Sequence, residues 1–222
     1  MAEKIYGLEA VLFDQDGVVV DSEGAWDGAR RAIVAENGGR WKPDATRTMM
    51  GMSAPEWSRY LRDELGVALS PGEISDQVVE RLLSEYKRSL PLIPGAVDAV
   101  KRVAVRWPVG LASSANREVI DAVLAASGLA GVFGATVSGE EVARGKPAPD
   151  IYLEAARRLD VDPARSAAVE DSTNGLRSAA AAGMRVVALP NREFPPAEDA
   201  LALASVVLDS LDELSPEMLE RL

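Results

Sequence analysis

The amino-acid sequence predicts an α/β fold, in which a doubly wound parallel sheet carries an all-helical insertion after its first strand. Beyond residue 95, short apolar segments with a strand pattern alternate with amphipathic helical segments. This alternation is typical of parallel sheets with helices on both faces. The stretch from residue 41 to residue 90 has helical spacing and no convincing strand. One apolar run, at residues 8–13, precedes that stretch and supplies the first strand.

The N-terminal part is expected to hold the first strand and four helices. Asp21 or Ser22 can cap the first helix, which we expect to continue to about Glu36. Three more helices are predicted at residues 45–50, 54–65 and 72–89. We therefore expect two domains, which are a core of residues 1–20 and 92–222 and a helical domain of residues 21–91.

The C-terminal part is expected to supply the rest of the sheet. Strands are predicted at residues 109–112, 135–137, 166–169, 185–189 and 205–208. Helices fill the intervals, and the one at residues 176–182 ends at Gly183, which suits a left-handed helix cap. Ser210, with Glu213 three residues later, has the spacing of a capping box and predicts a final helical turn.

Composition points to a globular enzyme outside the membrane. The chain has 222 residues, of which 47% are hydrophobic and 27% charged, which is ample for a core. No apolar run approaches the roughly 20 residues needed to cross a bilayer, and the N-terminus lacks the pattern of a signal peptide. Cysteine is absent, which excludes disulfides and thiolate metal sites. We expect a cytoplasmic protein, either a monomer or a weak homodimer.

Charge and the missing histidine narrow the chemistry. The net charge is −11, from 35 acidic and 24 basic residues, and this disfavours nucleic acid, whose binding depends on clustered Lys and Arg. An anionic metabolite would need a local cation. With no histidine in the sequence, a Ser-His-Asp triad and His-based zinc sites are excluded. Carboxylates, lysine and hydroxyls remain as the reactive groups.

Two acids, Asp14 and Asp16, follow the first predicted strand, and Gly17 comes directly after them. Residues i and i+2 of an extended chain point the same way, so both carboxylates can face one pocket. Carboxylates held that close repel each other unless a cation or a substrate charge joins them. A solvated acidic turn, in which Asp and Gly are common, would give the same pattern.

Polar residues also follow other predicted strands. In parallel sheets, ligands bind beyond the carboxyl ends of the strands, so these residues are expected to meet at one edge. The residues are Ser113, Ser114 and Asn116 after one strand, Glu170 and Asp171 after another, and Lys146 before the helix near residues 149–159. Each has a simpler explanation when taken alone, because serine caps helices, lysine is usually solvated and acids favour helix N-termini.

Four motifs together resemble the haloacid dehalogenase (HAD) superfamily of phosphohydrolases, in the subfamily with a helical cap between the first and second motifs. They are Asp14-Gln15-Asp16-Gly17-Val18, Leu111-Ala112-Ser113-Ser114, Gly145-Lys146-Pro147 and Val169-Glu170-Asp171-Ser172. The resemblance covers essentially the whole chain and implies a Rossmann-like core. Gln15 departs from the pattern, since relatives usually carry an apolar residue there.

The resemblance implies a role for each motif residue. Asp14 would be the nucleophile that forms an aspartyl-phosphate, and Asp16 would act as general acid and base. Ser113 would hold phosphoryl oxygens, and Lys146 would offset negative charge. Mg²⁺ suits an all-oxygen site, and its ligands would be Asp14, the backbone carbonyl of Asp16, Glu170 and Asp171.

Within the superfamily, the sequence favours a phosphatase of a small phosphorylated metabolite, with sugar phosphates ahead of others. Dehalogenases lack the second acid, and phosphonoacetaldehyde hydrolases need a cap lysine that nothing here marks. The alternative is a sugar phosphomutase of the β-phosphoglucomutase type. Such mutases carry a histidine where this chain has Trp26 and a cap arginine where it has Ala54, although Arg59 could substitute about one helical turn later.

Substrate choice is expected to depend on the cap and on the loop after Ser113. The residues expected to line the cleft are Glu23, Trp26, Met52, Ser114 and Asn116. Trp26 could equally anchor the helix to the cap, and Glu23 could cap its own helix. A receiver-type phosphorylation switch is disfavoured by the helical insertion, and an inactive binding module by the intact motifs. The expected partner is a small phosphorylated molecule, not nucleic acid or a membrane.

Overall fold

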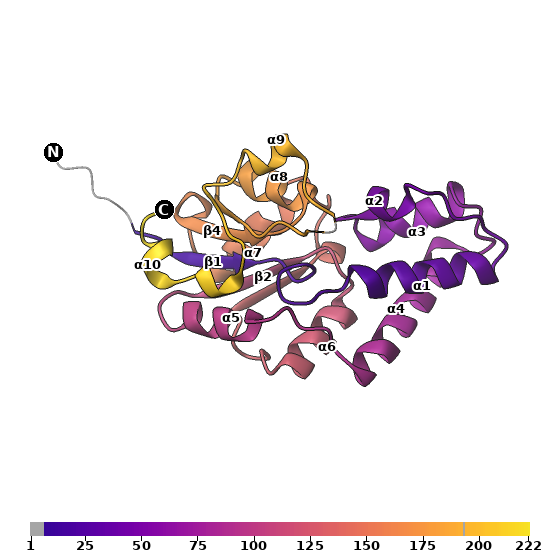
Figure 1. Ribbon diagram of the computed structural model, residues 1–222, viewed down its shortest axis with the longest axis horizontal. Coiled ribbons are helices and arrows are strands. Elements are labelled where there is room, and N and C mark those ends of the chain that lie inside the picture. The colour runs from indigo at the N-terminus through magenta and orange to yellow at the C-terminus, as the bar shows by residue number, and fades with distance from the viewer. Residues whose placement is uncertain (1–6, 193) are drawn as a thin grey trace.

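The structure is a computed structural model that describes residues 7–192 and 194–222. It contains a six-stranded parallel sheet with helices on both faces, and the predicted doubly wound α/β fold is confirmed (Figure 1). The strands lie in the order β3-β2-β1-β4-β5-β6, which puts the first strand of the chain in the middle. Their bounds are β1 Ala10–Phe13, β2 Val109–Ser113, β3 Ala135–Ser138, β4 Ser166–Glu170, β5 Arg185–Ala188 and β6 Val206–Val207.

Four helices separate β1 from the rest of the sheet and gather at one end of the molecule (Figure 1). They are α1 Glu23–Glu36, α2 Ala45–Met49, α3 Ala54–Asp63 and α4 Pro71–Arg88. Both α3 and α4 begin with a serine, a proline in the first turn and a glutamate that completes a capping box. Helices α1 and α3 pack against α4. We refer to α1–α4 and their loops as the cap.

The remaining helices cover the sheet. They are α5 Ala96–Ala104, α6 Arg117–Ser127, α7 Asp150–Leu159, α8 Thr173–Ala181, α9 Glu198–Leu201 and α10 Pro216–Leu219. Side chains alternate between the two faces of a strand, and β1 follows this rule. Val11 and Phe13 pack in one apolar cluster with α5 and α6, whereas Ala10 and Leu12 pack in a second cluster with α7 and α8. The central strand is therefore buried on both faces.

The structure corrects several predicted boundaries. Helix α8 begins at Thr173 instead of residue 176, because the Ser172 hydroxyl accepts a hydrogen bond from the Gly175 amide and caps the helix three residues earlier. Ser210 introduces only a 3₁₀ turn, and Ser215 caps the terminal helix α10. The first strand begins at Ala10 rather than residue 8, and the last is reduced to Val206–Val207. The short helix α9 is not anticipated by the sequence.

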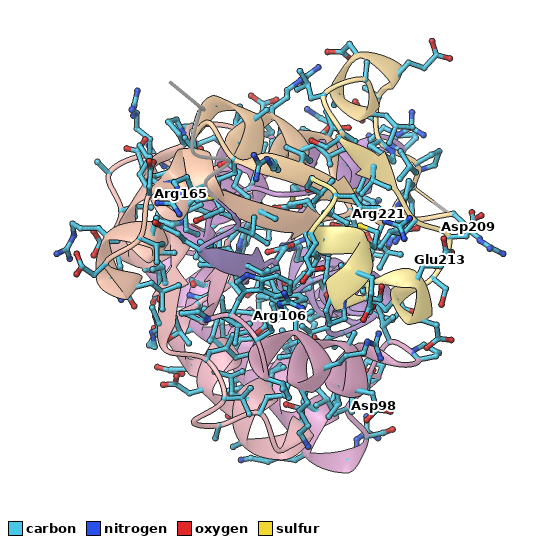
Figure 2. All side chains as sticks on the ribbon, turned by 90° about the vertical axis from the view of Figure 1, so that its left-hand side faces the viewer. Asp98, Arg106, Arg165, Asp209, Glu213 and Arg221 are labelled. Carbon is cyan, nitrogen blue, oxygen red and sulfur yellow. The ribbon has the colours of Figure 1, made fainter. Side chains whose placement is uncertain are left out.

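Two chain segments join the cap to the core, and they lie side by side. The Asp21 amide donates to the Pro91 carbonyl at 2.8 Å, and the Ile93 amide donates to the Val19 carbonyl at 3.0 Å. Figure 2 views the opposite end of the molecule, where it labels Arg106 and Arg221. Arg106, just after α5, forms an ion pair with Glu220 at the end of α10. Among the described residues, no helix has the length and apolar character to cross a membrane.

Candidate active site

The carboxyl ends of three adjacent strands bring the motif residues together. Phe13 of β1 is level with Leu111 of β2 and with Val169 of β4, so the residues that follow them emerge at one edge of the sheet. The Asp14 amide donates to the Val169 carbonyl at 3.0 Å, which extends the strand pairing by one residue. The parallel register therefore brings Asp14 to the same edge of the sheet as Ser113 and Glu170, although they are far apart in sequence.

Lys146 holds two of these acids together. Its ammonium group lies 2.8 Å from Asp14 Oδ1 and 2.6 Å from Glu170 Oε1, and it donates a third hydrogen bond to the Ala112 carbonyl at 3.0 Å. The residue is only 4% exposed. Burial by itself lowers the pKa of Lys146, but the two carboxylates outweigh it and raise that pKa above its usual value. The lysine is therefore a fixed positive charge.

Glu170 is fully buried and has little freedom to move. The Tyr152 hydroxyl donates to Glu170 Oε1 at 2.6 Å, the same oxygen that Lys146 contacts. Gly175 presses against the other side, because a Cβ added there would lie 1.8–2.2 Å from the Glu170 carboxylate atoms. A glycine at that position of α8 is thus what lets the helix approach the acid.

Three carboxylates form a group that could hold a metal ion. Oxygens of Asp14, Glu170 and Asp171 all lie within 4.8 Å of one another, and all three residues are buried. Asp171 Oδ1 has no hydrogen-bond partner among the described residues. Burial raises the pKa of both Asp14 and Asp171, and neighbouring carboxylates raise it further. Lys146 supplies one positive charge for three acids, which leaves negative charge uncompensated. Because the donors are all carboxylate oxygens, a hard divalent cation such as Mg²⁺ fits this group.

Gly17 makes room for this group. Its φ of +82° is in the left-handed region, and a Cβ there would lie 1.9 Å from Asp171 Oδ2. The turn after the two acids therefore requires a glycine, both for its backbone conformation and for its packing.

Asp16 is oriented toward the cap instead of toward the three carboxylates. Its Oδ1 accepts hydrogen bonds from the Ser22 hydroxyl at 2.5 Å and from Trp26 Nε1 at 3.2 Å. Its Oδ2 accepts a longer bond of 3.3 Å from the Ser113 hydroxyl. Ser22 precedes α1 but makes no side-chain cap there, since its hydroxyl is directed to Asp16. The first turn of α1 thus positions the second acid.

A cavity of about 40 Å³ lies between the strand ends and the cap. Residues from both sides line it, and most of the predicted site residues are among them. Those that line it are Asp14, Asp16, Glu23, Trp26, Met52, Ser114, Lys146 and Asp171. Ser113 and Glu170 lie directly behind this lining and are fully buried.

Asn116, predicted as a substrate contact, does not reach this cavity. Its amide donates to Glu140 Oε1 at 2.8 Å and to the Ser75 hydroxyl at 3.3 Å, and it lies at the rim of a separate surface depression. As the residue before α6, it turns toward the cap helix α4. Arg59, considered as a replacement for a cap arginine, is exposed and donates to its own helix at the Pro55 carbonyl.

Several lining residues were not predicted from the sequence. The most informative is Arg30, which is buried on α1 and lines the cavity together with Trp57 of α3. Glu23, Trp26 and Arg30 are spaced by three and four residues, so they share one face of α1. That spacing is the sequence signal that could have identified Arg30.

The chain is similar in sequence and in structure to known hydrolases and phosphatases. Residues 8–183 match the family described as haloacid dehalogenase-like hydrolase. Hexitol phosphatase B of Escherichia coli (strain K12) is 34% identical over 212 residues, which are 93% of this chain and 94% of that protein. Protein CbbY of Rhodobacter capsulatus is 34% identical over 197 residues, covering 83% and 86% of the two chains. The crystal structure of CbbY from Rhodobacter sphaeroides with phosphate superposes with a TM-score of 0.85 at 30% identity, over 97% of this chain and 100% of that one.

Proposed function

The chain belongs to the haloacid dehalogenase-like hydrolase family, and we propose that it is a magnesium-dependent phosphatase that hydrolyses a small sugar phosphate through an aspartyl-phosphate. The observation that carries this proposal is the buried bridge from Lys146 to Asp14 and Glu170, beside the unpartnered oxygen of Asp171. Several relatives with similar chains are phosphatases by name, and hexitol phosphatase B supports a carbohydrate substrate. Residues 21–91 would serve as the cap domain over the core.

Asp14 is suited to attack phosphorus. Lys146 takes one of its carboxylate oxygens, and no described residue donates a hydrogen bond to the other, Oδ2. Attack by that oxygen would form the aspartyl-phosphate and split one difficult displacement into two easier steps. Lys146 would stabilise the negative charge that gathers around the transferring group.

Asp16 is placed to move protons in both steps. It would protonate the leaving oxygen first, and its carboxylate would then take a proton from the attacking water. The three donors on Asp16, from Ser22, Trp26 and Ser113, fix where that carboxyl group points. The hydroxyl of Ser113 and backbone N–H groups of the same loop would hold phosphoryl oxygens.

Asp14, Glu170, Asp171 and the backbone carbonyl of Asp16 would hold Mg²⁺. When bound, the ion would supply positive charge to the phosphoryl oxygens and would relieve the repulsion among the buried carboxylates. Glu170 would contribute indirectly or through its second oxygen, because Lys146 and Tyr152 already occupy the first.

The cap must move for a substrate to enter. Cavities that hold small molecules usually measure about 300 Å³ or more, whereas this one measures about 40 Å³. The cap is held down by the Ser114 hydroxyl on the Gly51 carbonyl at 3.1 Å and by the Asn174 amide on the Met50 carbonyl at 3.3 Å. We expect the hinge at residues 18–20 and 89–94, where the two connecting segments pair.

The alternative, a β-phosphoglucomutase-type activity, has less support. Ala54 follows the Gly51-Met52-Ser53 segment where those mutases carry an arginine, and Arg59 does not line the cavity. Incubation of glucose 1-phosphate with its bisphosphate primer should release phosphate. Formation of glucose 6-phosphate faster than phosphate release would favour the mutase.

The direct test is hydrolysis of p-nitrophenyl phosphate by the purified protein. We expect turnover with added Mg²⁺, loss of turnover with EDTA, and recovery when the ion is restored. Asp14→Asn should reduce kcat by about 10³-fold or more, because an amide cannot act as the nucleophile. Turnover that survives both EDTA and Asp14→Asn would contradict the proposal.

A further inference from the structure

Arg30 is the cavity residue whose surroundings are least explained by the proposed chemistry. It is only 6% exposed and lies on α1, facing the space between cap and core. Its guanidinium carbon lies 4.8 Å from the ring centroid of Trp26 and 5.1 Å from that of Trp57. The two rings are 6.0 Å apart and inclined at 59°. Cation–π contacts with both rings hold the charged group in place.

No described residue uses the hydrogen-bonding capacity of Arg30. No carboxylate oxygen of the described residues lies within 4.0 Å of it, no described residue accepts a hydrogen bond from it, and its Nε is buried without a partner. Arg102 shows the usual arrangement in this protein, since it donates three hydrogen bonds to the carbonyls of Leu211 and Leu214. A buried guanidinium without acceptors is costly. An acceptor that arrives with the ligand would remove that cost.

Glu23 lies on the same face of α1, seven residues before Arg30, and lines the same cavity. No described residue donates a hydrogen bond to its carboxylate. This part of the cavity therefore presents unpaired donors on Arg30 beside unpaired acceptors on Glu23. A ligand that satisfies both must itself accept and donate hydrogen bonds, which hydroxyl groups do.

We propose that Arg30 and Glu23 form a hydroxyl-binding subsite that recognises the neutral, polyhydroxylated end of the substrate, away from the phosphoryl group. The inference rests on the proposed phosphatase function and makes Arg30 a specificity-determining residue. Vicinal hydroxyls would accept from the guanidinium edge and donate to the carboxylate. A second phosphate or a carboxylate at this point would also meet Arg30, but it would lie against Glu23, and like charges repel.

The test compares two substrates that share the phosphoryl chemistry and differ in hydroxyls. We would measure kcat/KM with Mg²⁺ for sorbitol 6-phosphate and for p-nitrophenyl phosphate in the wild type, Arg30→Met and Arg30→Lys. Arg30→Met keeps an unbranched side chain between the tryptophans but removes the donors. The ratio of the two kcat/KM values should fall about 10- to 100-fold, mainly through KM for sorbitol 6-phosphate. Arg30→Lys keeps the charge but loses the planar guanidinium, so its ratio should lie between those of the wild type and Arg30→Met.

The matched control is Arg62→Met, because Arg62 is an exposed arginine of the same cap and lies outside the cavity. Its substrate ratio should equal that of the wild type. An unchanged ratio in Arg30→Met, with both substrates affected alike, would overturn the subsite while leaving the phosphatase function intact. Absence of Mg²⁺-dependent turnover of either substrate by the wild type would overturn the proposed function itself.

Fructose 1,6-bisphosphate separates hydroxyl from anion recognition. The subsite predicts that wild-type kcat/KM is lower for this bisphosphate than for sorbitol 6-phosphate, and that Glu23→Gln narrows the difference because it removes the repelling charge. A bisphosphate preference that Arg30→Met abolishes would show an anion site instead and would overturn the proposal.

Discussion

The two walls of the cavity differ in how completely their polar groups are paired. On the core wall, Lys146 joins Asp14 Oδ1 and Glu170 Oε1 through hydrogen bonds of 2.8 and 2.6 Å. Asp171 Oδ1 is the acceptor there that the described residues leave without a donor, for an incoming ion. On the cap wall, Arg30 and Glu23 have no hydrogen-bond partner among the described residues, and two tryptophans fix the arginine instead. The core wall lies at the strand ends, whereas Arg30 and Glu23 of the cap wall share one face of α1.

This difference separates the chemistry from the selection of substrate. Groups that must act on every phosphoryl transfer are fixed in advance, which avoids reorganisation during the reaction. Groups that select the substrate keep their donors and acceptors free, so that the bound substrate supplies their hydrogen-bond partners. Substitutions in the core wall should therefore reduce stability and turnover together, and substitutions in the cap wall should act mainly on selectivity.

The largest effect is expected for Lys146→Met, which leaves Asp14 and Glu170 buried without their counter-ion. Breaking one partner out of a buried ion pair costs about 3–5 kcal/mol, or about 10 °C in Tm for a chain of this size. Turnover should also be lost. Thermal unfolding with and without Mg²⁺ measures this, and the ion should restore part of the stability.

The matched control is Lys42→Met, because Lys42 forms an exposed ion pair with Glu64 at 2.9 Å on the cap. Solvent-exposed ion pairs contribute little to stability because water and salt screen them, so its Tm should shift little. Equal shifts in the two variants would mean that the core wall is not held by its buried charges.

The next effect is expected for Gly175→Ala, where the new methyl group would meet the Glu170 carboxylate at 1.8–2.2 Å. Since Lys146 and Tyr152 hold Glu170, it cannot move aside freely, and overpacking of this kind costs about 1–3 kcal/mol. Affinity for Mg²⁺ should fall as well. Gly72→Ala in α4 is the control, because its methyl group would meet nothing within 4 Å, and it should leave Tm equal or slightly higher. A Gly175→Ala protein with wild-type Tm and metal affinity would contradict the close packing of α8 against Glu170.

The same contrast between the two walls explains which features of the molecule can be predicted from its sequence. Asp14, Lys146 and Asp171 could be placed together because parallel strands end at one edge, and chain order then fixes which residues arrive there. The fold followed from the alternation of strands and helices for the same reason. Domain roles and residue roles stay predictions, because they concern chemistry and not only position.

Features set by side-chain direction lay beyond the sequence. Asn116 follows a strand end as Ser113 does, yet its amide turns away to Glu140, a contact that only the path of the loop determines. Arg30 was missed because a charged residue on an apolar helical face is ordinarily assigned to solvent. The partnership of Tyr152 with Glu170 depends on how α7 packs on the sheet, which no local pattern encodes.

A smaller effect is expected where the two walls meet, at the hydrogen bond from Trp26 Nε1 to Asp16. Trp26→Phe removes the donor and leaves those from Ser22 and Ser113. Loss of a single hydrogen bond of about 1 kcal/mol corresponds to about a fivefold lower kcat. Steady-state kinetics with p-nitrophenyl phosphate and Mg²⁺ measure this loss.

Trp107→Phe is the control for this variant. Trp107 also donates an indole hydrogen bond, to the Leu8 carbonyl at 2.9 Å, but it lies outside the cavity. That variant should lose stability at unchanged kcat. If Trp26→Phe behaves in the same way, Trp26 is only an anchor between helix and cap.

The smallest effect is expected for Glu23→Gln and appears as a pH dependence of stability. Burial raises the pKa of Glu23 from 4.5 to about 7, and Arg30 opposes that rise without cancelling it. Between pH 4.5 and 7 the folded protein therefore holds a proton that the unfolded chain has released. Stability contributed at this site is lost as pH rises through that window. The Tm difference, variant minus wild type, should be near zero at pH 4.5 and should increase to a plateau above pH 7.

Glu154→Gln provides a control of opposite sign. Hydrogen bonds from Arg157 and Arg158 lower the pKa of Glu154 to about 2, so its ionised form favours the folded state above pH 4.5 and that contribution is lost as pH falls toward 2. This variant should be slightly less stable than the wild type above pH 4.5. In the Arg30→Met variant, the pH range over which Glu23 changes stability should extend to higher pH, because the substitution removes the positive charge that lowers the pKa of Glu23. A Glu23 window that does not respond to Arg30 would mean that the two groups on the cap wall act independently, and that the substrate does not meet them as a pair.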